Sequence, residues 1–138
     1  MAGDKTHPEV QGIVGHTRGE VFVFADLDEL KAWQGPKNGQ NGIIVVAQTT
    51  FQVTKWLECT NFIKKDYTNA EIFDTICNAT WTRQQEAEDL SRKCDLMVVI
   101  GGHHSSNTQK LVKVAEKHTK AVTVETAKEL LPEWFESV

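Results

Sequence analysis

Short apolar runs alternate with amphipathic segments along the chain, and this alternation predicts most of the fold. Runs rich in β-branched and aromatic side chains are typical of strands. We expect strands at residues 21–24, 43–47, 69–75, 96–100 and 121–124. The run at 43–47 is apolar at every position, which is typical of a strand covered on both faces.

The segments that follow these strands favour helices. Asp26 can cap a helix N-terminus with Glu29 three residues on, which predicts a helix that runs to about Trp33. Further helices are expected at residues 51–63, 80–93, 107–118 and 125–131, and a surface loop at 35–42. Strand and helix alternate throughout, so we predict an α/β fold of βαβ units with parallel sheets and right-handed crossovers. A seam near Phe73 would divide the chain into α/β modules at 1–73 and 74–138.

Composition narrows the class of protein. A chain of 138 residues can bury one ordinary core or two small subdomains. Its net charge of −4 argues against nucleic acid or anionic lipid as the main partner, because both call for clustered lysine and arginine. No run approaches the ~18 apolar residues of a membrane span, and the first residues contain no apolar stretch for a signal peptide. Three widely spaced cysteines do not suit a disulfide framework, so we expect a reducing, cytoplasmic compartment.

Four short polar motifs carry the candidate chemistry. They are His7-Pro8-Glu9, Gln48-Thr49-Thr50, Cys77-Asn78-Ala79-Thr80 and Ser105-Ser106-Asn107. The last three each fall where a predicted strand gives way to a predicted helix. In an open parallel sheet that edge is where ligands bind, so the motifs predict one shared site.

The Ser105-Ser106-Asn107 motif follows a Gly-Gly turn and opens a predicted helix. The N–H groups at a helix N-terminus favour anions, so two hydroxyls and an amide there suit a phosphate or diphosphate. The alternative is that Ser106 only caps the helix, and the two interpretations stay equally open. Thr50 could likewise cap the helix that starts near Phe51, which would leave Thr49 free to meet a ligand.

The first motif places an imidazole and a carboxylate two residues apart. If Pro8 holds the segment extended, His7 and Glu9 project to similar sides and form an acid–base pair. Glu9 would then deliver protons and His7 would bind an anion. The alternative, an exposed turn near a frayed terminus, is the more frequent outcome for such a segment.

Cys77 is predicted at a helix N-terminus, with Thr80 one turn further on. A thiolate is stabilised there, either for nucleophilic attack or for metal ligation. Cys59 lies inside a helical pattern and Cys94 ends another helix, so both are expected to be structural. Adjacent histidines rarely point at one ion, so we expect His103 and its neighbour to be solvated loop residues.

Taken together, the stretches HPEVQGIVGH, AQTTF, ICNATWTRQ and GGHHSSNTQKL resemble the 4-hydroxy-3-methylbut-2-enyl diphosphate reductase family (LytB/IspH). The four motifs occur in the family's order, and the resemblance covers essentially the whole chain. It implies a trefoil of three α/β modules around a [4Fe-4S] cluster held by three cysteines. It also implies reductive dehydroxylation of an allylic diphosphate to isopentenyl and dimethylallyl diphosphate in the non-mevalonate pathway, with a ferredoxin- or flavodoxin-type electron donor.

The resemblance assigns roles to individual residues of this chain. Glu9 would be the proton donor, Thr49 would contact the substrate near its hydroxyl, and Cys77 would be a cluster ligand. The residues implied to bind the substrate are His7, Thr49, Thr80, Ser105, Ser106 and Asn107.

The chain also departs from the family pattern. The family carries two further cluster cysteines and two further substrate histidines in a module before the HPE motif, and a serine-bearing segment after the last helix. We therefore expect the chain to be the second module and part of the third, and to be inactive alone, because one thiolate cannot hold a four-iron cluster. The alternatives are a cluster-free diphosphate-binding module, or a homo-oligomer that pools Cys77 from several chains.

Overall fold

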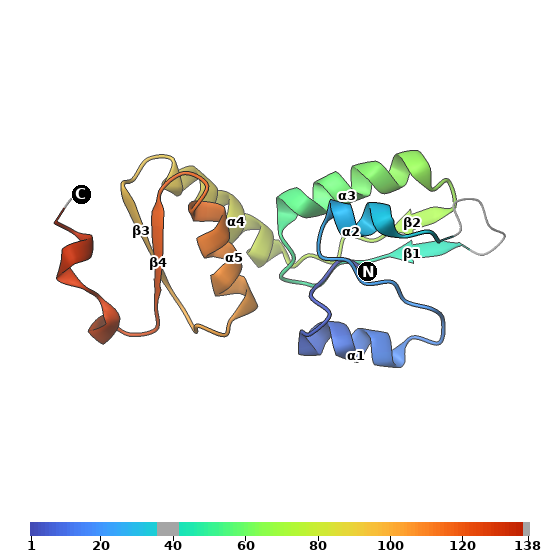
Figure 1. The fold of residues 1–138 in the computed structure, drawn as a ribbon, viewed down its shortest axis with the longest axis horizontal. Coiled ribbons are helices and arrows are strands. Elements are labelled where there is room, and N and C mark those ends of the chain that lie inside the picture. Colours follow the sequence, from blue (N-terminus) through green and yellow to red (C-terminus); the bar gives the residue numbers. More distant parts are fainter. Residues whose placement is uncertain (36–41, 137–138) are drawn as a thin grey trace. The chain divides into compact units, whose positions relative to one another are not determined.

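The computed structural model describes residues 1–35 and 42–136, and these divide into two compact units, Met1–Ile76 and Cys77–Val138 (Figure 1). Both units combine parallel strands with helices, so the predicted α/β class is confirmed. Most of the loop expected at 35–42 lies outside the described residues.

The first unit is built around a parallel pair of strands joined by a helix. Its elements are α1 (Pro8–His16), α2 (Leu27–Ala32), β1 (Ile43–Val45), α3 (Val53–Asp66) and β2 (Ala70–Ile72). Ile43 lies opposite Ala70, and α3 is the crossover that returns the chain to the start of β2. α2 begins as expected, because the Asp26 side chain accepts a hydrogen bond from the Glu29 N–H.

The core of the first unit is formed by one face of α3. Its buried residues recur at helical spacing, and they are Val53, Trp56, Cys59, Thr60 and Ile63. This face packs towards β2 and α2, where Leu30 is only 2% exposed. Burial of a leucine of this kind stabilises a fold by about 2–3 kcal/mol, so the face fixes α3 against the sheet.

The strand expected at 21–24 is wrong in extent. Only Phe24 makes a bridge there, and its partner is Ala2, which bridges in parallel to Ala47 on its other side. Residues 21–23 lie outside any named strand. The reason is that a strand needs a partner along its length, and the structure gives this apolar run a partner for only one bridge.

The second unit repeats the strand–helix–strand arrangement. Its elements are α4 (Asn78–Ser91), β3 (Leu96–Ile100), α5 (Ser106–Ala115) and β4 (Lys120–Val124), followed by two 3₁₀ turns at Ala127–Glu129 and Pro132–Trp134. β3 and β4 are parallel, with Leu96 opposite Lys120, and α5 connects them. Figure 1 shows α4 and α5 packed side by side.

The helix expected at 125–131 is wrong, because within that range the structure has only the 3₁₀ turn Ala127–Glu129. Pro132 disfavours the helical conformation of the residue before it, and Leu131 is extended. A capping box between Thr126 and Glu129 closes the first 3₁₀ turn. The chain therefore leaves β4 in tight turns.

Candidate functional site

His7 and Glu9 lie at the start of a helix that the sequence pattern did not predict. Pro8 occupies the first turn of α1, where its missing N–H is not needed, and His7 is the N-cap. The His7 Nδ1 accepts a hydrogen bond from the Glu9 N–H at 3.2 Å. The expected extended segment is therefore wrong for Pro8 and Glu9: a proline after a capping side chain starts a helix.

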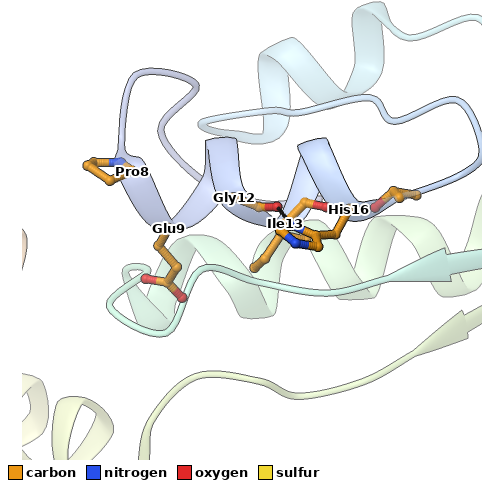
Figure 2. Close-up of a pocket in the computed structure, with 6 residues that line it drawn as sticks. Pro8, Glu9, Gly12, Ile13 and His16 are labelled. Atoms are coloured by element: carbon orange, nitrogen blue, oxygen red, sulfur yellow. Dashed lines mark hydrogen bonds between the residues drawn. The ribbon is translucent and has the colours of Figure 1, made fainter.

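The Glu9 carboxylate is held by the loop that follows β1. The Thr49 N–H donates to Glu9 Oε1 at 2.8 Å, and the Thr49 hydroxyl donates to Glu9 Oε2 at 3.0 Å. Figure 2 shows Glu9 directed from α1 towards this loop, while Gly12, Ile13 and His16 continue along the helix and line a surface hollow of about 530 Å³. The structure thus joins two predicted site residues that are 40 positions apart.

Two residues to which the sequence analysis gave no role build this part of the site. Gln48 is fully buried: its Oε1 accepts from the Asp4 N–H at 3.1 Å, and its amide nitrogen donates to Thr50 Oγ1 at 3.1 Å. The Thr75 hydroxyl accepts from the Ala47 N–H at 2.8 Å, which ties the end of β1 to the segment after β2. A buried glutamine next to an apolar strand was the available signal, since such a group needs partners.

The expected cap at Thr50 is also wrong. α3 begins later, with Gln52 as N-cap and no side-chain capping bond. Thr50 is used instead as an acceptor for Gln48, and the backbone turns tightly because the Phe51 N–H donates to the Gln48 carbonyl at 2.9 Å. This turn leaves Thr49 exposed, and the Thr49 hydroxyl donates a hydrogen bond to the Glu9 carboxylate.

In the second unit the serine motif forms the N-terminus of α5. Ser105 is the N-cap, and its hydroxyl accepts from the Thr108 N–H at 3.4 Å, so the cap expected at Ser106 is one residue off. Ser106 and Asn107 are the first two helical residues. Among the described residues the buried Asn107 Oδ1 has no hydrogen-bond partner, which marks an amide group whose interactions are incomplete.

The loop that carries Ser105 is tied from several sides. Its backbone at Gly101 passes so close to the Thr108 side chain that any Cβ there would collide. The His103 N–H donates to Glu125 Oε1 at 2.6 Å, and the His103 ring lies 2.8 Å from Glu129 Oε2. The Glu125 N–H, then the His103 ring, lower the pKa of the Glu129 carboxyl. His103 is an exposed loop residue, as expected, and its ring also pairs with Glu129.

Cys77 is exposed at the N-cap of α4, and Thr80 is buried one turn later. Helices α4 and α5 both run back from the edge where β3 and β4 end, so Cys77 and Ser105 share that edge of the unit. Burial raises the pKa of the Cys59 thiol to about 11, which fits a structural cysteine. Within residues 1–35 and 42–136, no three metal-ligating side chains gather, so this part of the chain does not fit a complete four-iron cluster.

The chain belongs to the LytB protein family, because its residues 1–138 match the model of that family. Named relatives are 4-hydroxy-3-methylbut-2-enyl diphosphate reductases. The reductase of Nautilia profundicola is 39% identical over 135 residues, covering 97% of this chain and 48% of the relative. That of Geobacter metallireducens is 43% identical over 141 residues, covering 100% and 48%.

A solved structure agrees with these relatives. The chain is similar to the E-1-hydroxy-2-methyl-but-2-enyl-4-diphosphate reductase from Plasmodium falciparum, with a TM-score of 0.89 and 26% identity over 99% of this chain and 43% of that one. The chain thus spans about half the length of the curated relatives it matches. No helix in the described parts of the chain is both long and apolar enough to cross a bilayer.

Proposed function

We propose that the chain is the central and part of the C-terminal α/β module of a 4-hydroxy-3-methylbut-2-enyl diphosphate reductase. One observation supports this most strongly: the LytB family match runs over residues 1–138, and so includes every candidate site residue. The reaction would remove the hydroxyl of an allylic diphosphate as water, using two electrons and two protons. The electrons would come from a ferredoxin- or flavodoxin-type donor.

In this proposal the first unit supplies the proton donor. The Thr49 hydroxyl donates to Glu9 Oε2 and still has lone pairs for a substrate hydroxyl. Glu9 would therefore deliver a proton, and Thr49 would orient the leaving hydroxyl. His7 has its Nδ1 engaged by the Glu9 N–H, so its Nε2 is the ring atom for the diphosphate.

The second unit would bind the diphosphate. Its groups are Ser105 and Ser106, the amide of Asn107, and the N–H groups at the start of α5, where the helix dipole favours negative charge. Thr80 would support the same end of the unit from α4. Cys77 would be one of three cysteine ligands of a [4Fe-4S] cluster, which supplies electron transfer in this family; this chain alone does not fit the whole group.

Anaerobic iron reconstitution tests the reductase proposal. We expect the purified chain to hold much less than one four-iron cluster and to show no reductase activity, because it offers a single exposed thiol. Iron counting, combined with a measurement of the molecular mass in solution, distinguishes a single chain from a homo-oligomer. One cluster per three chains would favour a homo-oligomer that pools Cys77, and one active cluster per chain would overturn the inactivity of the chain.

A cluster-free diphosphate-binding module is the second candidate, favoured by the N-terminus of α5, where the helix dipole and the backbone N–H groups attract an anion. Titration with inorganic pyrophosphate tests it. Ser105→Ala should weaken binding about tenfold, the loss of roughly one hydrogen bond to a charged group. Cys77→Ala should leave binding unchanged.

The matched control is Asp26→Ala. It removes the N-cap of α2 and should cost about 1 kcal/mol of stability, as Ser105→Ala should. Asp26 is not in the proposed diphosphate site, so its loss should not change pyrophosphate affinity. Equal weakening by both variants would mean that Ser105 acts through stability alone.

A further inference from the structure

His103 is hydrogen-bonded through its N–H, its carbonyl and its ring, although it lies in the exposed loop between β3 and α5. Its N–H donates to Glu125 Oε1 at 2.6 Å, and its carbonyl accepts from Gln109 Nε2 at 2.8 Å. The ring Nε2 lies 2.8 Å from Glu129 Oε2. Exposed loops are ordinarily among the more mobile parts of a fold, so three bonds to three different segments make His103 a fixed point of this loop.

The two glutamates that hold His103 are themselves fixed. Glu125 comes directly after β4, whose last residue, Val124, is only 2% exposed. Glu129 Oε1 accepts from both the N–H and the hydroxyl of Thr126, each at 3.1 Å, and this closes the 3₁₀ turn. The Glu129 carboxylate therefore caps the turn with one oxygen and holds the His103 ring with the other.

His103 is part of the turn that leads into α5. The Ser105 N–H donates to the Gly102 carbonyl at 2.9 Å, so residues 102–105 form a β-turn in which His103 is one of the two central residues. The path of this turn sets where the Ser105 hydroxyl and the first N–H groups of α5 lie. His103 therefore holds the N-terminus of α5 without belonging to the helix.

The ring of His103 is the part of this arrangement that can respond to pH. Imidazole is the side chain whose charge ordinarily changes between about pH 5 and 8, and the pair with Glu129 is an ion pair only when the ring is protonated. The Glu125 carboxylate is engaged by the His103 N–H. The ionisable groups in the segments around the ring are Glu125 after β4, Lys128 and Glu129 on the 3₁₀ turn, Lys110 on α5 and His104 in the β-turn itself.

We propose that His103 is a positioning residue for the diphosphate site and that it makes diphosphate binding depend on pH. The protonated ring pairs with Glu129 and holds the turn at 102–105, which keeps the Ser105 hydroxyl and the N–H groups of α5 directed at the anion. Loss of the proton weakens this pair and loosens the turn. The proposal rests on the proposed function, which places the diphosphate at the start of α5, and it adds a control of that site by pH.

Titration with inorganic pyrophosphate at pH 5.5 and 8 tests the effect of the charge. The full chain is compared with His103→Gln, which keeps the backbone bonds but has an uncharged side chain. The unchanged chain should bind about threefold more tightly than His103→Gln at pH 5.5, as expected for one exposed ion pair, and about equally well at pH 8. Pyrophosphate itself titrates in this range, so the quantity to compare is the ratio of the two affinities at each pH.

His103→Lys separates positioning from direct attraction of the anion. Its ammonium stays charged at both pH values, so it should restore tight binding and remove the dependence on pH. If this variant acts by pairing with Glu129, its advantage over His103→Gln should disappear when Glu129→Gln is added. Glutamine also serves in a capping box, so that change keeps the 3₁₀ turn. An advantage that persisted would mean that the lysine attracts pyrophosphate directly, which would contradict the positioning role.

His118 offers a matched control in the same unit. Its ring lies 3.5 Å from Glu88 Oε1, beyond the C-terminal end of α5, so His118→Gln removes another histidine–glutamate pair. This variant should leave pyrophosphate affinity and its pH dependence unchanged. An equal effect of His118→Gln would mean that pH acts through the stability of the unit and not through the turn.

Amide hydrogen exchange measures the turn without any ligand. The Ser105 N–H should exchange about threefold faster in His103→Gln than in the unchanged chain at pH 5.5, because its bond to the Gly102 carbonyl opens more often. His103→Lys should restore the slower exchange. The Thr119 N–H, which bonds to the Ala115 carbonyl at the other end of α5, is the internal control and should not change.

Two further results would overturn the positioning proposal. They are a ratio of affinities that is the same at both pH values, and equal exchange of the Ser105 N–H in the unchanged chain and both His103 variants. Either result leaves the proposed function standing as long as the chain binds pyrophosphate. Absence of pyrophosphate binding at both pH values would instead count against the proposed function, and exchange at Ser105 would then still decide whether His103 holds the turn.

Discussion

The two units of the chain share a strand–helix–strand arrangement, but they differ in how completely their polar groups are hydrogen-bonded within the chain. In the first unit the Glu9 carboxylate receives two hydrogen bonds from Thr49, and the buried Gln48 is hydrogen-bonded through both its amide oxygen and its amide nitrogen. In the second unit Cys77 is exposed and the buried Asn107 Oδ1 has no described partner. The polar groups of the first unit are therefore held by hydrogen bonds within the chain, whereas those of the second unit are less completely paired.

The proposed roles of the two groups would account for this difference. A proton donor must hold one position relative to the reacting atom, so its neighbours fix it in advance. An anion site at a helix N-terminus uses backbone N–H groups that the fold already orients, and it needs only a loop of the right shape. We therefore expect substitutions in the first unit to act through the loss of side-chain hydrogen bonds. Substitutions in the second unit should act through the shape of the loop before α5.

The largest expected contrast is between two thiols. Cys59 in the first unit is fully buried and the pKa of its thiol is raised to about 11, whereas Cys77 is exposed. Iodoacetamide should therefore modify Cys59 at least about 100-fold more slowly than Cys77 at pH 8. Mass spectrometry of peptides over time measures both rates. Similar rates would show that the first unit opens readily.

The pH dependence of stability should also differ between the units. The pKa of the Met1 amine falls from 8.0 unfolded to about 6 folded, so between these values the unfolded chain binds a proton that the folded chain does not. The first unit should therefore gain up to about 2–3 kcal/mol as pH rises from 6 to 8. Hydrogen bonds from Arg92 lower the pKa of Glu88, so its contribution is lost only as the pH falls into the acidic range.

Urea unfolding at pH 5.5 and 8.5 measures the first of these effects. The control is the chain acetylated at Met1, which has no titrating amine but keeps every histidine. If the acetylated chain shows the same rise in unfolding free energy, the Met1 amine is not its source.

The third contrast lies within the loop before α5. Gly101→Val would place side-chain atoms against Thr108 and should destabilise the second unit by about 1–3 kcal/mol, with weaker pyrophosphate binding. Gly102→Ala is the control, since its Cβ would meet nothing nearer than 3.6 Å. Thermal unfolding and pyrophosphate titration compare the two variants. If both variants unfolded at the same temperature and bound pyrophosphate equally well, the shape of this loop would not determine pyrophosphate binding.

The smallest expected effect is the coupling between Glu9 and Thr49. A double-mutant cycle with Glu9→Gln and Thr49→Val should give an interaction free energy of about 1 kcal/mol in urea unfolding. The pair is partly exposed, which limits its size. A coupling near zero would mean that the first unit is no more organised than the second.

Much of the fold was predictable because its signals are local. The strand at 96–100 was predicted at its full extent, and the helix of α2 began at its predicted cap, Asp26. α1 was missed because its apolar face is short and largely unburied, so the hydrophobic period that marks most helices is weak there. The 21–24 strand was overpredicted because strand assignment depends on a partner, which a local pattern does not contain.

The sequence by itself determined which residues are available for chemistry and that they fall at strand ends and helix starts. Only the tertiary structure decided that Thr49 bonds Glu9 and that Ser105 rather than Ser106 caps α5. The physical reason is the range of the interactions. Caps and periodicity act over a few residues, whereas pairing across 40 positions depends on how the strands and helices pack.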